Sequence, residues 1–224
     1  MNKRILFNDG WVFAKSSLDV IDCSNLKFER IDIPHDWLIY NVSNLYENSI
    51  GWYKKKFILN DKAKDKRILL WFDGVYMNSS LYVNNEYIGE WKYGYSSFEH
   101  DITKALRVGE NEIILKVIHE SPNSRWYSGA GIYRNVYLKI REKNYIDTNG
   151  IYVVTKKYKD SFYVNVNTRL NMINNGVLKH KVIKNDEVIA RVSQIITTEK
   201  PILVYDDEQC SALGNSSTSW GADC

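Results

Sequence analysis

The sequence contains few of the residues that build disulfide frameworks and metal centres. It has three cysteines, Cys23, Cys210 and Cys224, and four histidines in 224 residues. No CxxC or HxxxH spacing occurs, so the pattern argues against a zinc site, and we expect no metal. The unpaired cysteine count favours free thiols in a reducing compartment over disulfides.

Long apolar runs and a strong charge of one sign are also missing. The apolar stretch nearest the first residue, Ile5–Phe7, is too short for the core of a secretory signal, and no window approaches a membrane span. The 30 Lys and Arg against 27 Asp and Glu are dispersed, which does not favour nucleic-acid binding. We therefore expect a cytoplasmic protein that binds neither nucleic acid nor membrane.

The chain also lacks a glycine-rich loop of the kind that holds phosphate groups. Gly129 and Gly131 lie close together, but no strand-turn-helix pattern surrounds them. Together with the missing metal-ligand spacing, this predicts that the protein uses no cofactor.

Aromatic residues are abundant, with seven Trp and 16 Tyr. Indole and phenol rings combine a flat apolar face with a polar tip, which suits both the cores of β-sandwiches and stacking on the C–H faces of sugars. We expect core packing for most of them, because amphipathic aromatics are common in sheets.

Short alternating or apolar segments separated by turn residues predict β-strands along the whole chain. Residues 4–13 indicate a hairpin or a strand and turn around Asp9-Gly10. The apolar runs at 68–72 and 113–119 are typical of strands covered on both faces. An Asn84-Asn85 turn predicts a hairpin that pairs Val83 with Glu86, Tyr82 with Tyr87 and Leu81 with Ile88.

Two segments combine turn residues with side chains suited to recognition. Residues 123–136 read Asn-Ser-Arg-Trp-Tyr-Ser-Gly-Ala-Gly-Ile-Tyr-Arg-Asn-Val. They predict a loop that presents side chains, followed by a strand from Tyr133 to Ile140. Residues 34–37 read Pro-His-Asp-Trp. Neighbours on an extended chain point to opposite sides, so His35 and Asp36 cannot easily act as a base and its orienting group. The alternatives are a rim loop over Trp37, a loop facing a substrate, and part of a freestanding triad.

Both segments resemble the N-terminal sugar-binding domain of glycoside hydrolase family 2, which includes β-galactosidases, β-glucuronidases and β-mannosidases. A Gly-Tyr-Ser-Ser-Phe stretch at 94–98 is similar to a Gly-Tyr-Ser-Pro-Phe-like stretch of that family, with Ser97 where proline is common. The resemblance is greatest to the β-galactosidase branch. It implies an all-β fold: a jelly-roll-type sandwich over 1–142, then a partial immunoglobulin-like sandwich over 146–205.

Residues 206–224 have no periodicity and contain two of the three cysteines. They predict either an aberrant segment, from a frameshift, a premature stop or a gene-model artefact, or a disordered tail.

The resemblance also implies which residues meet the substrate. In the family, loops of this domain lean over the mouth of a catalytic (β/α)-barrel. By position in the motif, Arg125 is the expected sugar contact, Trp126 and Tyr127 shape the pocket wall, and Asp36 and His35 are further candidates. The alternatives are a surface ion pair for Arg125 and core packing for Trp126. Arg134 is expected to be structural.

We expect no catalytic residue in this chain. A (β/α)-barrel takes about 250 residues, and the predicted strands after residue 142 alternate with no helices. Asn85-Glu86 and Asn111-Glu112 echo the family's acid/base dipeptide, but both belong to predicted hairpin turns. The sequence thus predicts a non-catalytic fragment of a β-galactosidase-like enzyme that binds a carbohydrate, needs a catalytic barrel and forms homo-oligomers in its full-length form. A freestanding carbohydrate-binding module and a partner subunit are the alternatives.

Overall fold

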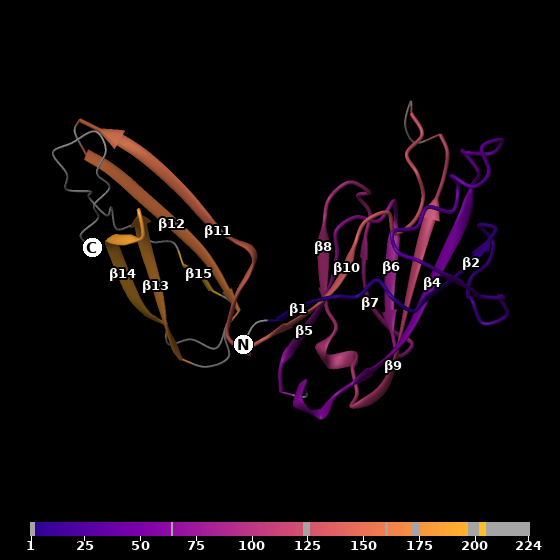
Figure 1. The fold of residues 1–224 in the computed structure, drawn as a ribbon, viewed down its shortest axis with the longest axis horizontal. Helices are drawn as coiled ribbons and strands as arrows, with labels where there is room; N and C mark the ends of the chain where they lie inside the picture. The colour runs from indigo at the N-terminus through magenta and orange to yellow at the C-terminus, as the bar shows by residue number, and fades with distance from the viewer. Residues whose placement is uncertain are drawn as a thin grey trace. The chain divides into compact units, whose positions relative to one another are not determined.

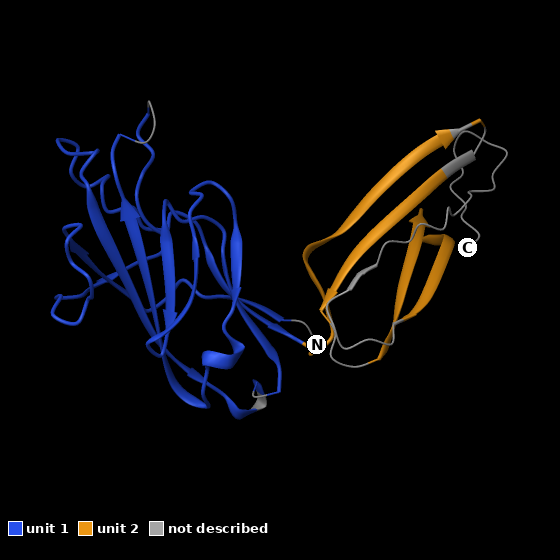
Figure 2. Ribbon diagram, turned by 180° about the vertical axis from the view of Figure 1, so that it is seen from behind, with its two compact units in different colours: residues 1–141 blue, residues 142–224 orange. Residues whose placement is uncertain are grey.

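The regular structure of the described residues consists mainly of β-strands (Figure 1). The computed structural model describes residues 3–63, 65–122, 126–159, 161–171, 175–196 and 202–204. In these ranges the helical elements are two 3-10 turns, η1 (Asp61–Ala63) and η2 (Thr103–Ala105), and no helix is long and apolar enough to cross a membrane. The all-β prediction is confirmed. Contacts divide the chain into two compact units, Met1–Arg141 and Glu142–Cys224 (Figure 2).

The first unit consists of two antiparallel sheets. The smaller has the strand order β1-β10-β5-β8 and the larger β3-β2-β4-β9-β6-β7. The strands are β1 (Lys3–Leu6), β2 (Trp11–Ser16), β3 (Glu29–Ile31), β4 (Ser49–Leu59), β5 (Arg67–Phe72), β6 (Ser79–Val83), β7 (Glu86–Trp91), β8 (Phe98–Asp101), β9 (Gly109–His119) and β10 (Val136–Arg141).

One apolar core lies between the two sheets. Tyr53 of β4 and Leu115 of β9 enter it from the larger sheet, and Leu70 of β5 and Val136 of β10 enter it from the smaller sheet; all four are fully buried. Burial of each such side chain contributes about 1.5–3 kcal/mol. The predicted β-sandwich is therefore confirmed in this unit.

A second, smaller cluster covers part of the outer face of the larger sheet. Cys23 packs there with Ile50 and Trp52, so the irregular segment before β3 lies against the sheet. Along β9, alternate residues from Ile113 to His119 are buried and the others are half-buried, of which Ile114 and Ile118 pack on the Cys23 cluster. The strand is covered on both faces, but unequally.

Of the two alternatives predicted for residues 4–13, the structure has the strand and turn. β1 and β2 do not form a hairpin, because β1 pairs with β10 and β2 pairs with β3 and β4; the turn ending at Gly10, whose φ is +71°, carries the chain from one sheet to the other. The strand expected from Tyr133 begins at Val136. Tyr133 itself belongs to the preceding loop, where its hydroxyl donates to the Gly94 carbonyl at 2.8 Å.

The β6–β7 hairpin follows its predicted register over two pairs. Val83 pairs with Glu86 and Tyr82 with Tyr87, but Leu81 pairs with Gly89 because the register shifts between Leu81 and Tyr82. Such a bulge inserts one residue into one strand. The third predicted pair, Leu81 with Ile88, is therefore wrong.

The second unit is also antiparallel. β11 (Tyr145–Tyr158), β12 (Ser161–Asn171) and β15 (Ile202–Val204) form one group, and β13 (Gly176–Lys184) pairs with β14 (Glu187–Ile196) across the predicted Asn185-Asp186 turn. The boundaries 1–142, 146–205 and 206–224 stay predictions. The expected tail, with Cys210 and Cys224, lies outside the described residues.

Candidate functional site

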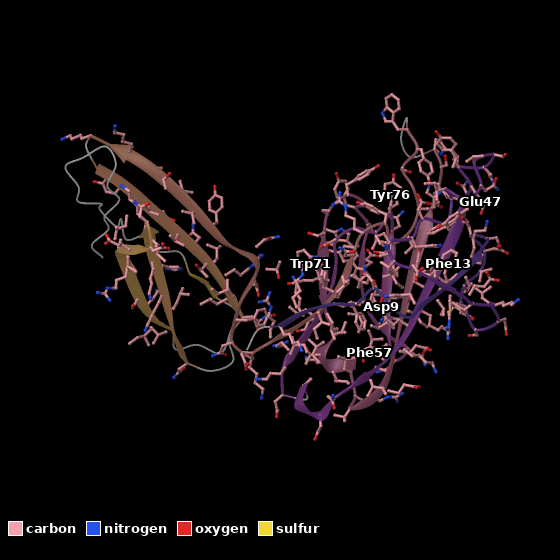
Figure 3. All side chains as sticks on the ribbon, viewed as in Figure 1. Asp9, Phe13, Glu47, Phe57, Trp71 and Tyr76 are labelled. Atoms are coloured by element: carbon pink, nitrogen blue, oxygen red, sulfur yellow. The ribbon has the colours of Figure 1, made fainter. Side chains whose placement is uncertain are left out.

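Four loops meet at one end of the sandwich, where Ser49 at the start of β4 pairs with His119 at the end of β9. We call residues 35–48, 74–78, 92–97 and 126–135 the loop cluster. The Tyr76 and Gly131 backbones exchange hydrogen bonds at 2.8 and 2.9 Å, and His119 Nδ1 bonds the Glu47 carbonyl at 2.7 Å. Figure 3 labels Tyr76 and Glu47 at this end.

The two segments chosen from the sequence lie side by side in this cluster. The His35 backbone N–H donates to the Ile132 carbonyl at 2.8 Å, and the Trp37 N–H donates to the Ala130 carbonyl at 3.1 Å. Trp37 is buried, and its indole N–H donates to Ser49 Oγ at 3.0 Å. The Pro-His-Asp-Trp segment is therefore fixed below by Trp37 and laterally by residues 130–132.

Asp36 joins these two segments through its carboxylate. Oδ1 accepts hydrogen bonds from the backbone N–H groups of Leu38 at 3.0 Å and Ala130 at 3.1 Å. Oδ2 accepts one from the Tyr127 hydroxyl at 2.5 Å. Three donors satisfy this half-buried carboxylate, so it holds the 127–130 turn in place.

The glycines of the motif are needed because this corner is crowded. Gly129 has a φ of +77°, and a Cβ there would lie 2.8 Å from Asp36 Oδ2. Gly131 has a φ of +128°, and a Cβ would lie 2.3 Å from the Tyr53 hydroxyl oxygen. Both conformations favour glycine, and neither site has room for a side chain.

His35 lies inside the sandwich. Its ring is 8% exposed, and Nδ1 lies 2.9 Å from the Tyr53 hydroxyl. Burial lowers the pKa of His35 and raises that of Tyr53. Burial thus favours the neutral imidazole, which forms a hydrogen bond with the Tyr53 hydroxyl, while the Tyr53 oxygen accepts the Ile132 N–H at 3.4 Å. The pair supports the loop cluster from within.

Trp126 and Tyr127 follow one another but lie in different environments. Trp126 is 76% exposed, so the core packing considered for it does not occur. Tyr127 is half-buried against the core, and burial, together with its bond to Asp36, raises the pKa of its phenol. Arg125 lies outside the described residues. Arg134 is exposed and stands over the Tyr133 ring at 5.2 Å rather than in a strand.

Further aromatic side chains of the loop cluster were not selected from the sequence. Tyr93 and Tyr95 are 61% and 52% exposed, and the Tyr95 ring lies 5.2 Å from that of Tyr76 and 5.9 Å from that of Tyr93. Tyr40 is 79% exposed, with its ring 6.2 Å from His35. In the sequence, the many aromatic residues at 91–98 were the feature that could have identified Tyr93 and Tyr95.

The described part of the loop cluster lacks a pair of carboxylates suited to glycoside hydrolysis. Its acids are Asp36, used as above, and Glu47, whose Oε1 lies 2.7 Å from Lys15 Nζ. Glu86 and Glu112 lie toward the other end of the larger sheet, because Glu112 precedes His119 by seven strand residues, about 23 Å. Glu112 is within β9 rather than in a turn. No metal-ligand group occurs among the described residues.

The sequence matches the family model described as "Glycosyl hydrolases family 2, sugar binding domain" over residues 27–142, just over half of the chain. A β-galactosidase of Bacteroides ovatus is 39% identical over 137 residues, covering 56% of this chain and 16% of that protein. A β-glucuronidase of Bacteroides fragilis is 29% identical over 170 residues, covering 67% of this chain and 23% of that protein.

Solved structures of family 2 glycosyl hydrolases are also similar to this chain. A glycosyl hydrolase family 2 member from Bacteroides cellulosilyticus superimposes with a TM-score of 0.69 at 31% identity, covering 93% of this chain and 30% of that one. The first three curated relatives are covered over 16% to 29% of their own length. The chain belongs to glycoside hydrolase family 2 and corresponds to the N-terminal, non-catalytic part of such an enzyme.

Proposed function

We propose that the loop cluster binds the sugar of a β-glycoside and completes the substrate site of a catalytic (β/α)-barrel. One observation carries this proposal: the Trp126 indole is 76% exposed on a segment whose backbone is fixed by Asp36 and two glycines. An exposed aromatic ring on a rigid support is suited to stacking on the apolar face of a sugar.

The five candidate residues take different roles in this proposal. Trp126 stacks on the sugar and Tyr127 forms the wall beside it. Arg125 supplies a planar guanidinium that bonds vicinal hydroxyls or a carboxylate. Asp36 and His35 act through their neighbours, because both are already bonded to groups of the loop cluster and its support.

We further propose that the substrate is a galactoside. The support is that the 39% identical relative is named a β-galactosidase. The isolated chain should not hydrolyse nitrophenyl β-galactoside. Turnover that survives rigorous purification and persists in Arg125→Ala would contradict a non-catalytic role.

Two finer proposals concern the setting of the protein. A cytoplasmic location is supported by the buried free thiol of Cys23, and fractionation of the source cells tests it. Homo-oligomerisation of the full-length enzyme stays a prediction, which light scattering of that enzyme tests.

Ligand-observed NMR with the 224-residue chain tests the sugar site. We expect saturation transfer to methyl β-galactoside, its loss in Trp126→Ala and its retention in Tyr87→Ala. Tyr87 is a matched control because it is 54% exposed on the β6–β7 hairpin, away from the loop cluster. Absence of transfer across a panel of sugars, or equal transfer in Trp126→Ala, would contradict the proposal.

A freestanding carbohydrate-binding module makes the same prediction, saturable binding by the isolated chain. Resequencing of the coding DNA from about codon 195 separates the two, because a continuing open frame that encodes a (β/α)-barrel would favour the enzyme fragment. A separate catalytic chain that lacks this sandwich and copurifies with it would instead identify a partner subunit.

A further inference from the structure

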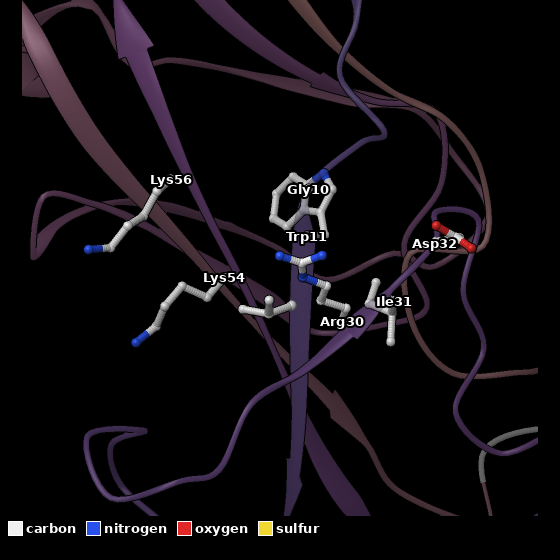
Figure 4. A pocket seen from close by; sticks show the side chains of 8 residues that line it. Gly10, Trp11, Arg30, Ile31, Asp32, Lys54 and Lys56 are labelled. Atoms are coloured by element: carbon white, nitrogen blue, oxygen red, sulfur yellow. The ribbon is translucent and has the colours of Figure 1, made fainter.

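A pocket of about 630 Å³ lies on the outer face of the larger sheet, at the strands β3, β2 and β4 (Figure 4). Arg30, Val12 and Lys54 line it from these three strands, and Lys56 and Asp32 lie at its sides. None of these residues belongs to the loop cluster. Its volume is within the range of sites that hold small ligands.

Strand register brings three cations together in this pocket. Val12 pairs with Arg30 on one side and with Lys54 on the other. Arg30 and Lys54 are therefore two strand spacings apart, about 10 Å, with Val12 between them. Lys56 is two residues beyond Lys54 on the same face of β4, about 7 Å away. In Figure 4 the two lysines extend on one side and Asp32 lies on the opposite side.

These cations are partly compensated, since Asp32 lines the same pocket and Glu112 pairs with Lys56 across β4 and β9. Among the described residues neither Arg30 nor Lys54 forms an ion pair, although Lys54 Nζ lies 4.5 Å from the centre of the Phe28 ring. Lys56 lies 3.5 Å from Glu110, but both side chains are more than 60% exposed, and exposed pairs of this kind contribute little. An anionic ligand would relieve the repulsion among the three cations.

The remaining lining selects the kind of anion. The half-buried Val12 forms an apolar floor between the charges, which suits the C–H face of a sugar ring. The Asp32 carboxylate accepts hydrogen bonds from hydroxyl groups and repels a second carboxylate or a phosphate. Hydroxyls on one side and an acidic group on the other are features of an acidic sugar.

We propose that this pocket binds an acidic oligosaccharide, one that carries carboxylate or sulfate groups, independently of the loop cluster. Arg30, Lys54 and Lys56 hold the acidic groups, Asp32 accepts sugar hydroxyls, and Val12 supports the ring.

Isothermal titration of the 224-residue chain tests this site with tetragalacturonate, a sulfated galactotetraose that carries no carboxylate, and a neutral galactotetraose. We expect the acidic probes to bind at least about tenfold more tightly than the neutral one, and binding to weaken as NaCl is raised. Whether the carboxylate or the sulfate probe binds more tightly distinguishes the two acidic groups.

Substitutions locate the binding. Arg30→Gln and Lys54→Gln should each weaken it about tenfold, the loss expected for one charge-assisted hydrogen bond. Lys116→Gln is the matched control, because this lysine lies over the Trp52 ring outside the pocket. Trp126→Ala should leave acidic binding unchanged, which separates this site from the loop cluster.

Several results would overturn the inference: no binding of either acidic probe, equal binding of the neutral one, or equal losses in Lys116→Gln. Polyglutamate that binds as tightly, with the same dependence on Arg30 and Lys54, would show a surface for acidic peptides instead. Circular dichroism of each variant checks that it is folded. If a variant is unfolded, the salt dependence of binding by the unmodified chain still tests the inference.

Discussion

The phenol of Tyr127 donates a hydrogen bond to Oδ2 of Asp36 at 2.5 Å, across 91 residues of sequence. The other oxygen of the same carboxylate accepts two backbone N–H groups. A single acidic side chain thus fixes two loops of the candidate sugar site, and its removal should affect stability as well as binding.

Tyr127→Phe should lower the free energy of unfolding by about 1.5–3 kcal/mol, because one hydrogen bond to a charged group is lost. Asp36→Ala should cost more, because it also leaves the Ala130 N–H without its acceptor. Urea unfolding of both single variants and the double variant measures the coupling. Strictly additive losses would contradict a direct bond.

Gly131→Ala and Gly109→Ala separate steric crowding from backbone strain. Both glycines have positive φ, +128° and +97°, but a Cβ at Gly131 meets the Tyr53 hydroxyl oxygen at 2.3 Å, whereas nothing lies within 4 Å at Gly109. We expect about 1 kcal/mol of destabilisation at Gly109 and at least about 3 kcal/mol at Gly131. Similar midpoints of chemical denaturation for the two variants would contradict the steric crowding at Gly131.

Glycine substitutions at two neighbouring asparagines of the β6–β7 turn should change the stability of the protein in opposite directions. Both have positive φ, but the Asn84 side chain donates to the Ala105 carbonyl and to Asn111 Oδ1, both at 2.8 Å. Asn85→Gly should stabilise by about 0.4–1 kcal/mol, because glycine suits the second position of this turn. Asn84→Gly should destabilise. Thermal unfolding of the two variants checks the signs.

Stability should fall as the pH is lowered from 7 to 5. Burial lowers the pKa values of His35 and His100 below their ordinary value of 6.5, so the unfolded chain binds more protons in this range. The contribution of the neutral imidazoles to the free energy of unfolding is fully present above pH 6.5 and decreases as the pH falls below that value. Urea titrations of His35→Gln and His100→Gln should show that the free energy of unfolding depends less on pH. An unchanged pH dependence in both variants would contradict the role of these histidines.

Strand positions and turn chemistry were predictable from local sequence, because side-chain alternation and turn residues act over a few positions. The pairs Val83–Glu86 and Tyr82–Tyr87 follow from Asn84-Asn85. The bulge that places Gly89 opposite Leu81 does not, and neither does the separation of β1 and β2 into different sheets, since both depend on neighbouring strands.

The candidate site was predictable as a set of residues but not as an arrangement. Asp36 and Tyr127 were selected because each segment resembles a known family, yet their hydrogen bond depends on how the two loops dock. Lys55 interrupts the apolar face of β4 in the sequence. In the structure it is buried, with Nζ bonded to the Asp9 carbonyl and 4.0 Å from the centre of the Phe7 ring.

The sequence by itself determined the all-β class, the family and the segments that form the candidate sugar site, because periodicity and motifs are properties of adjacent residues. Only the tertiary structure decided that His35 is buried, that Trp126 is exposed, and that Arg30 and Lys54 flank Val12. These facts depend on which distant strands become neighbours, since sheet pairing and core packing join residues that have no local relationship in the chain.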